Sequence, residues 1–289
     1  MSNHEFFNLT PPTPSPSQRR GGDKLKHLSL RRRGQGEVKT PPKKFMPLYL
    51  IDKPPGPTSH DIVDQIRRIT GERRVGHAGT LDPFASGLLI VAVGRDSTKE
   101  LSNFVGLDKV YEATFVLGAS SDTDDLTGKI MPMPFPPEFQ FPHNCSDRCS
   151  YEETIKSAMQ TFVGPIEQIP PAYSAIKIKG KKMYEAAREG KPLEVKARLV
   201  TIYEYELLDA NSIDKIRVRV HCSSGTYIRA LARDLGRALG VGGYVSELRR
   251  TAIGSYRIEE AGVLSKLVDP PPLPSPVCPF DWPQGTLKN

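Results

Sequence analysis

The sequence predicts an α+β fold with a mixed, largely antiparallel sheet and flanking helices. Segments with the patterns of strands neighbour one another between helical segments, without the repeated strand–helix–strand rhythm that gives a parallel sheet. No internal repeat is visible in the 289 residues. A chain of this length can bury a sizeable core, in one large domain or two smaller ones.

Composition divides the chain into three parts. Residues 1–45 contain ten Lys or Arg and three Asp or Glu, so they carry the whole net charge of +7. This stretch is too rich in Pro, Ser, Arg and Lys to bury a core, which predicts a disordered basic arm suited to RNA or DNA. A solubility tail or an over-extended gene start is the alternative. We expect a folded domain over residues 46–262 and a short proline-rich extension over 263–289.

The folded domain is expected to begin with a short strand at 48–51. Thr58 and Ser59 can then cap a helix that ends at Gly71. The apolar face of this helix consists of Ile62, Val63, Ile66 and Ile69. The elements expected next are a buried strand in the continuous apolar run at 88–93, a short helix at about 97–105 and an alternating strand at 109–117.

The second half combines long strands with amphipathic helices. The expected elements are helices at 154–163, 181–189 and about 226–239, strands at about 194–208 and 214–223, and a strand or hairpin around 249–258. Residues 132–150 read as a long loop, which carries His143, Cys145 and Cys149. A zinc site usually needs a fourth ligand and a second ligand pair, and the other two cysteines are no obvious partners. We therefore expect no metal, with zinc at this loop as the alternative.

Several classes of protein do not fit the sequence. The longest apolar run is far shorter than a transmembrane helix, and the N-terminus lacks the layout of a signal peptide. Four cysteines without a regular framework fit a reducing cytosol. We expect a cytoplasmic protein that does not associate with membranes.

Asp82 lies between a glycine-rich turn and the apolar run at 88–93, with His77 five residues before it. An Asp-Pro pair often serves only to start a turn. A second polar segment, Gly225 to Arg229, opens the helix at about 226–239 and places Arg229 in its first turn. An arginine there could form charge-assisted hydrogen bonds with a carboxylate, although spacing alone does not connect it with Asp82.

Four segments together carry a resemblance to a known family. They are Asp52-Lys53-Pro54-x-Gly56-x-Thr58-Ser59, Gly76-His77-Ala78-Gly79-Thr80-Leu81-Asp82-Pro83, Gly225-Thr226-Tyr227-Ile228-Arg229 and Leu248-Arg249-Arg250. Their order and spacing resemble the TruB family of pseudouridine synthases, as do Ser174-Ala175-Ile176-Lys177 and the segment from Gly180 to Gly190. The resemblance runs from about Leu48 to Ala261, so 46–262 is expected to be a pseudouridine synthase catalytic domain.

The resemblance implies an isomerase that converts a uridine of tRNA, at position 55 in the T-loop, into pseudouridine by base flipping and without a cofactor. By the same resemblance, Asp82 matches the catalytic aspartate and His77 a histidine that contacts the substrate loop. The remaining matches are Tyr111 with the tyrosine that stacks on the flipped base, Tyr227 with the pocket tyrosine, Arg229 with the arginine paired with the acid, and Leu248 with the pocket leucine.

One departure from the family concerns the end of the chain. Many members continue after the Leu-Arg-Arg segment into a PUA-type RNA-binding domain, whereas we expect no complete domain of this type after Ala261. We expect a monomer that binds the T-arm of tRNA without a guide RNA. The alternatives are an RNA-guided synthase of ribosomal RNA, and a non-catalytic module that binds or folds tRNA.

Overall fold

The computed structural model describes residues 48–136, 145–173, 177–178, 181–182 and 196–262. All of them lie in one compact unit of the chain, Phe45–Asn289. The basic arm, the proline-rich extension and His143 lie outside the described residues. Among the described residues, no helix is long and apolar enough to span a membrane.

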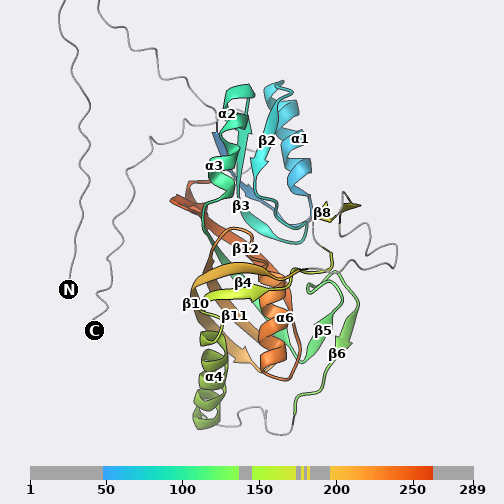
Figure 1. Ribbon diagram of the computed structural model, residues 1–289, viewed down its shortest axis with the longest axis vertical. Coiled ribbons are helices and arrows are strands. Elements are labelled where there is room, and N and C mark those ends of the chain that lie inside the picture. Colours follow the sequence, from blue (N-terminus) through green and yellow to red (C-terminus); the bar gives the residue numbers. More distant parts are fainter. Residues whose placement is uncertain (1–47, 137–144, 174–176, 179–180, 183–195, 263–289) are drawn as a thin grey trace, which may run out of the picture. The chain divides into compact units, whose positions relative to one another are not determined.

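A single large sheet organises this unit, with strands in the order β1-β3-β12-β4-β11-β10-β7 and with β2 and β13 paired at its side (Figure 1). The strands are β1 (Leu48–Lys53), β2 (Val75–Ala78), β3 (Ser86–Val93), β4 (Lys109–Leu117), β7 (Gly164–Gln168), β10 (Arg198–Ser212), β11 (Lys215–Cys222), β12 (Gly243–Ile253) and β13 (Tyr256–Arg257). Every pairing between these strands is antiparallel except that of β3 with β12. The predicted α+β class with a largely antiparallel sheet is therefore confirmed.

Two small hairpins lie outside the large sheet. One consists of β5 (Ala119–Ser121) and β6 (Ile130–Pro132), and the other of β8 (Lys177–Ile178) and β9 (Lys181–Lys182). The sequence pattern did not predict β5 and β6. It was also wrong at 181–182, where a helix was expected to begin and the chain instead pairs with β8. The rest of that expected helix, 183–189, lies outside the described residues.

Helix α1 (Ser59–Thr70) has the ends that its sequence predicts. The Thr58 hydroxyl accepts a hydrogen bond from the backbone N–H of Asp61, and the Asp61 carboxylate accepts one from the backbone N–H of Thr58. Gly71 ends the helix with φ +68°, a conformation that favours glycine. Ile69 is a correction, because this side chain at the end of the helix is 49% exposed and does not join the core.

The remaining helices are α2 (Arg95–Lys99), α3 (Leu101–Val105), α4 (Cys145–Gln160), α6 (Ile228–Ala238) and the 3₁₀ turn Ile258–Glu260. The helix expected at 154–163 corresponds to α4, which begins earlier, at Cys145, and ends earlier, at Gln160. Residues 145–150 were expected to be loop and are helix instead. Buried apolar side chains recur at every fourth residue of this helix, at Tyr151, Ile155 and Met159.

Strand β3 is buried on both faces, which explains its continuous apolar run. Leu89 and Val91 pack in the cluster that contains the apolar face of α1. Leu88 and Ile90 face the opposite cluster, to which α3 contributes Leu101 and Phe104. The larger cluster lies at β4, β10, β11 and β12, where α4 and α6 pack (Figure 1). The sheet therefore has two helix-covered parts, which meet where β3 pairs with β12.

The pairing of β3 with β12 is short and close. It is parallel and consists of the pairs Arg249 with Ser86 and Arg250 with Gly87. Gly87 has φ +107°, and a Cβ atom on it would lie 2.3 Å from the backbone oxygen of Arg250. Only glycine permits the two backbones to approach this closely.

Candidate functional site

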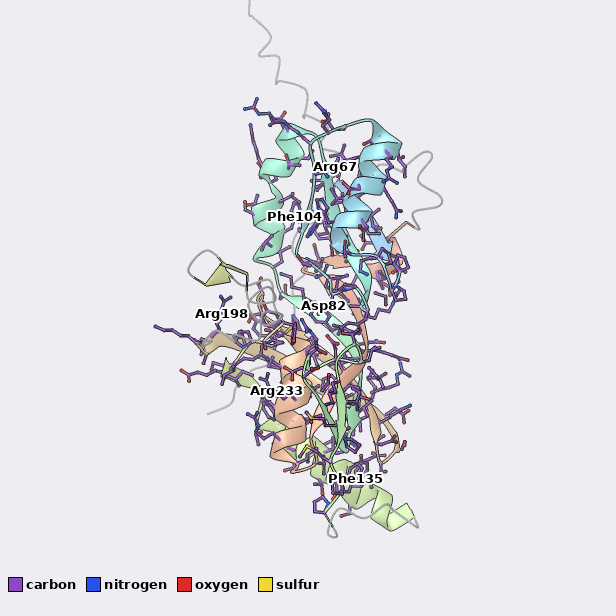
Figure 2. All side chains as sticks on the ribbon, turned by 90° about the vertical axis from the view of Figure 1, so that its right-hand side faces the viewer. Arg67, Asp82, Phe104, Phe135, Arg198 and Arg233 are labelled. Atoms are coloured by element: carbon purple, nitrogen blue, oxygen red, sulfur yellow. The ribbon has the colours of Figure 1, made fainter. Side chains whose placement is uncertain are left out.

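Asp82 lies in the loop between β2 and β3, at the junction of the two parts of the sheet. Figure 2 places it between the part that carries Phe104 and the part that carries Arg233. Its predecessor Leu81 has a backbone N–H that donates to the Ser59 hydroxyl at 2.9 Å. Its successor Pro83 has a carbonyl that accepts a hydrogen bond from the backbone N–H of Gly56 at 2.8 Å. The connection between β1 and α1 therefore fixes the loop on both sides of Asp82.

Lys53, at the end of β1, is a second anchor of this loop. Its side chain is fully buried, and the ammonium donates to the carbonyl oxygens of Pro54 at 2.9 Å, Pro57 at 2.8 Å and Pro83 at 3.2 Å. Burial lowers the pKa of Lys53 to about 8, although the nearby carboxylate of Asp82 acts in the opposite direction. The lysine thus ties three turns together directly beside Asp82.

Arg229 enters the site from the first turn of α6, as its position in the sequence predicts. The residue before this helix is Tyr227, whose backbone N–H donates to Gln168 Oε1 at 2.8 Å. The carbonyl of Tyr227 accepts a hydrogen bond from Gln168 Nε2 at 3.1 Å. Strand β7 therefore holds the start of α6 in place, and Arg229 is 4% exposed there.

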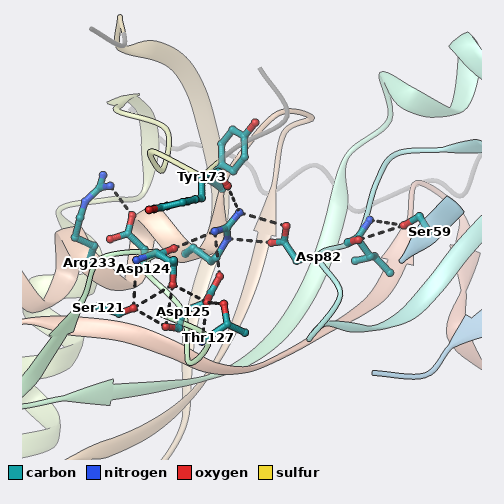
Figure 3. A network of polar contacts seen from close by, with 12 residues as sticks. Ser59, Asp82, Ser121, Asp124, Asp125, Thr127, Tyr173 and Arg233 are labelled. Atoms are coloured by element: carbon teal, nitrogen blue, oxygen red, sulfur yellow. Dashed lines mark hydrogen bonds and ion pairs between the residues drawn. The ribbon is translucent and has the colours of Figure 1, made fainter. Parts of the chain in front are cut away.

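The structure brings Arg229 and Asp82 together. Figure 3 shows Asp82 at one end of this network of polar contacts, with Asp125 and Tyr173 further along it. Arg229 Nε lies 2.9 Å from Asp82 Oδ2, and Nη2 donates to Oδ1 at 3.2 Å. The contact is an ion pair made along one side of the guanidinium, with both carboxylate oxygens engaged. Burial raises the pKa of Asp82 above its ordinary range, and the charge of Arg229 opposes that shift.

The opposite side of the guanidinium contacts a second carboxylate. Arg229 Nη1 lies 3.0 Å from Asp125 Oδ2 and donates to the carbonyl of Thr123 at 2.9 Å. The Oδ1 atom of Asp125 accepts hydrogen bonds from the Thr123 hydroxyl, from the Thr127 hydroxyl and from the Thr127 backbone N–H. Nη2 also donates to the carbonyl of Tyr173 at 3.1 Å. These contacts fix Arg229 on the side of the guanidinium away from Asp82, and Asp82 itself lines the pocket.

A neighbouring pair extends this network. Asp124 has φ +59° and accepts a hydrogen bond from Arg233 Nη1 at 2.7 Å. Arg233 lies one turn after Arg229 on α6 and also pairs with Asp234. Burial raises the pKa of Asp124 to about 6, against the opposing charge of Arg233.

Asp82 opens into a pocket of about 300 Å³. Its walls include Tyr111, Tyr227, Ile228 and Leu248, and its polar lining includes Asp82, Lys109, Arg229 and Arg250. Tyr111 is nearly buried, and burial raises the pKa of its hydroxyl. Of the residues singled out in the sequence, the pocket collects Asp82, Tyr111, Tyr227, Arg229 and Leu248.

His77 does not line this pocket. It lies in β2, opposite Val91 of β3, and its Nδ1 atom is buried without a hydrogen-bond partner among the described residues. Burial lowers the pKa of His77, so the neutral imidazole is favoured. The structure therefore places His77 near the loop of Asp82 but outside the lining of the pocket.

Asp125 was not predicted from the sequence as a site residue, and neither Lys53 nor Arg250 was given a role. The signal for Asp125 was the run Asp-Thr-Asp-Asp at 122–125, which resembles an ordinary polar turn. The zinc alternative is not tested, because His143 lies outside the described residues. Among the residues that are described, no cluster of three possible metal ligands occurs. Cys145 and Cys149 lie in α4, one turn apart.

Comparisons with known proteins fit this architecture. Residues 67–228 match the family described as TruB family pseudouridylate synthase (N terminal domain). Residues 229–269 match the tRNA pseudouridylate synthase B C-terminal domain. The chain therefore belongs to the TruB family of pseudouridylate synthases.

Individual relatives agree with the family. A protein named tRNA pseudouridine synthase B from Corynebacterium jeikeium is 47% identical over 231 residues, which cover 78% of this chain and 72% of the relative. A protein of the same name from Thermobifida fusca is 44% identical over 227 residues, covering 76% and 73% of the two chains.

Solved structures give the same fold. A chain in the crystal structure of a Cbf5-Nop10-Gar1 complex has a TM-score of 0.57 and 32% identity. The match covers 78% of this chain but about half, 54%, of that chain. A chain in the structure of an H/ACA RNP bound to a substrate RNA containing 2′-deoxyuridine has a TM-score of 0.55 and 30% identity, covering 78% and 53%.

Proposed function

We propose that this protein is a tRNA pseudouridine synthase, an isomerase that converts a uridine of tRNA into pseudouridine with Asp82 as its catalytic residue. The observation that carries the proposal is the ion pair between Asp82 and Arg229 at a pocket walled by Tyr111, Tyr227 and Leu248. Membership of the TruB family and the names of the relatives support the same reaction.

The reaction needs one carboxylate at the sugar. The bond between C1′ of the ribose and N1 of uracil must break, the base must turn, and its C5 must bond to C1′. An ionised carboxylate can attack the sugar as a nucleophile or stabilise a cation-like sugar, as in retaining glycosidases. A second carboxylic acid is unnecessary, since the departing uracil delocalises negative charge into its own carbonyl groups.

Arg229 has two tasks in this proposal. Because burial favours the protonated form of Asp82, a paired cation is required to keep it ionised. The side-on contact also fixes the direction of the carboxylate, since Asp125 and the Thr123 carbonyl hold the guanidinium from the other side. Arg229 is thus a positioning residue that acts through Asp82.

The walls of the pocket suit a base that has left its stack. Unstacking a nucleotide costs a few kcal/mol, and an aromatic platform returns part of that free energy. Tyr111, on the buried face of β4, is the proposed platform, while Tyr227 and Leu248 enclose the base. His77 is proposed to contact the RNA loop outside the pocket.

The finer proposal concerns the target, which we infer to be the uridine at position 55, presented by the T-arm of cytoplasmic tRNA. The protein is proposed to act alone as a monomer, with no cofactor and no guide RNA. An RNA-guided reaction is the alternative, because one structural neighbour is a chain of an H/ACA RNP bound to a substrate RNA. The relatives with higher identity are named as tRNA enzymes, which favours tRNA.

The deciding experiment is incubation of the purified protein with an unmodified tRNA transcript, followed by mapping of pseudouridine. We expect one pseudouridine, at position 55, without added RNA. A matched transcript with cytidine at position 55 should remain unmodified. Conversion only in the presence of an added guide RNA would favour the alternative, and RNA binding by an intact site without conversion would favour a non-catalytic module.

A further inference from the structure

Arg250 is a buried arginine that lines the pocket and has no role in the reaction proposed so far. It follows Leu248 by two residues on β12 and is 1% exposed. Its Nε donates to the carbonyl of Leu88 at 2.8 Å, and its Nη2 donates to the carbonyl of Gly79 at 3.2 Å. Both acceptors are neutral, and none of the ion pairs within the described ranges includes Arg250. Because a buried cation without a counter-charge is costly, its presence calls for an explanation.

The charges around the pocket are unbalanced. Among the described residues, the lining contains one carboxylate, Asp82, and three basic side chains, Lys109, Arg229 and Arg250. Arg229 is neutralised by Asp82 and Asp125 together. Lys109 donates to the backbone carbonyls of Val105 and Leu107 and to a serine hydroxyl. The pocket therefore has an excess of positive charge on the side of Arg250 and Lys109.

Arg250 lies close enough to several titratable groups at the pocket to change their pKa values. Burial is the largest cause that lowers the pKa of Lys109, to about 8, and the pKa of His77. The positive charge of Arg250 is the second cause in both cases. It also lowers the pKa of the Tyr111 hydroxyl, to which it hydrogen-bonds, against the larger effect of burial. Arg250 thus acts on the tyrosine that is proposed to support the base.

The proposed reaction creates negative charge at this place. When the C1′–N1 bond breaks, its electron pair leaves with the uracil, which is an anion until its C5 bonds to C1′. The C5 proton is then lost and N1 gains one, so the product is an isomer of the substrate. Asp82 and Arg229 act at the sugar, and neither provides a net positive charge for the detached base.

We propose that Arg250 is a further catalytic residue, whose uncompensated guanidinium stabilises the negative charge on the uracil between cleavage of the C1′–N1 bond and formation of the C1′–C5 bond. This inference rests on the proposed function. Fixed charges aimed at a developing anion in a dry pocket are among the largest contributions to catalysis, about 100-fold to 1000-fold for one group.

A purely structural role makes different predictions. Arg250 could serve only to hold Leu88 and Gly79, in which case its charge would be unimportant and its shape decisive. Arg250→Lys keeps the charge and loses the planar fork, whereas Arg250→Gln keeps a donor and loses the charge. Arg249→Gln is the matched control, because this neighbour is 42% exposed and pairs with Asp52 outside the pocket.

The test compares two substrates under single-turnover conditions with saturating tRNA. One carries uridine at the target and the other 5-fluorouridine, whose fluorine stabilises the base anion and so reduces the need for a protein cation. Cleavage is followed as loss of the original nucleoside after digestion and mass spectrometry. Thermal unfolding and tRNA affinity are measured for every variant.

We expect Arg250→Gln to lower the rate on uridine by about 100-fold and the rate on 5-fluorouridine at least tenfold less. Arg250→Lys should retain most of the activity near pH 7 and lose it as its buried ammonium deprotonates, more steeply on uridine. Arg249→Gln should change both rates within about threefold. If Arg250→Gln does not fold, the pH dependence of Arg250→Lys on the two substrates decides instead.

Equal losses on uridine and 5-fluorouridine, or equal losses for the Lys and Gln variants, would overturn a charge-based role. A wild-type protein that converts no uridine would instead refute the proposed function, so the two failures are distinguishable.

Discussion

Arg229 and Asp125 form a buried ion pair, 104 residues apart in the sequence, in which each partner is about 95% covered and Nη1 lies 3.0 Å from Oδ2. This pair gives Arg229 one fixed orientation. The remaining side of its guanidinium is then available for Asp82. The acid of the site is consequently positioned by a second acid that does not line the pocket.

Asp82→Asn should abolish pseudouridine formation while the fold and nearly all tRNA affinity are kept, because the change removes a charge and little volume. The measurement is single-turnover conversion together with tRNA titration. Substantial conversion by a sequence-verified Asp82→Asn protein would remove Asp82 from its catalytic role.

Arg229→Lys should lower the rate severely, because an ammonium cannot engage Asp82 and Asp125 at once with the planar geometry of a guanidinium. Arg217→Lys is the control, since Arg217 is 58% exposed and lies 3.9 Å from its partner Glu112. A near-normal rate for Arg229→Lys in the same assay would show that the pairing with Asp82 is unimportant.

Asp125→Asn should destabilise the protein by about 3 kcal/mol, because it leaves part of the charge of a buried arginine uncompensated. The rate should fall as well, since Arg229 loses its fixed orientation. Chemical denaturation and single-turnover kinetics measure the two effects. Glu112→Gln, which breaks an exposed pair with Arg219, should change stability by less than about 1 kcal/mol. Equal small effects of the two substitutions would contradict the expected role of Asp125.

The stability contributed by Lys53 should depend on pH in the alkaline range. Its pKa is lowered by burial to about 8 from an ordinary value of 10.5, so the unfolded chain binds more protons between these values. The free energy of unfolding should therefore rise by about 2 kcal/mol between pH 8 and 10 relative to Lys53→Met, which has no such group. Urea denaturation of both proteins across this range measures the difference, and a difference independent of pH would show that Lys53 titrates normally.

Removal of residues 1–45 should weaken tRNA binding mainly at low salt. The arm carries all the net charge of the chain, and contacts with phosphates release counterions, so the slope of log affinity against log salt should decrease. Turnover at saturating tRNA should change little, because no pocket residue is lost. The comparison uses the full chain and a chain beginning at Met46, and identical slopes would show that the arm does not contact RNA.

Local sequence signals predicted the elements that are determined by residues close together in the chain. Thr58 and Gly71 mark the ends of α1, and the alternation from Lys109 to Leu117 gives β4 with every second residue buried. Ile69 was misassigned because periodicity shows which residues share a face of a helix but not how far along that face the core extends. The hairpin of β5 and β6 was missed because its strands are three residues long.

The sequence predicted most residues of the site but not which of them contact one another. Asp82 and Arg229 were both singled out, yet 147 residues separate them, and only the folded sheet brings them within hydrogen-bond distance. Asp125 carried no separate signal, since an acid in a polar turn is usually solvated. The resemblance assigned His77 to contact with the substrate loop, and that role stays a prediction, since β2 places this residue outside the pocket lining.

The short pairing of β3 with β12 at Gly87 has a consequence for recombination between related genes. Asp82 comes from the strands before residue 94, whereas Arg229 and Asp125 both come from the chain after residue 108. A crossover within 94–108 would cut no strand of the large sheet. The two parents would then meet at the backbone contact of Gly87 with Arg250 and in the apolar cluster where Leu50, Leu88 and Ile90 pack with Ile253. Chimeras of this kind should assemble a working acid–arginine pair from two parents, provided that the parent of the first part supplies glycine at position 87.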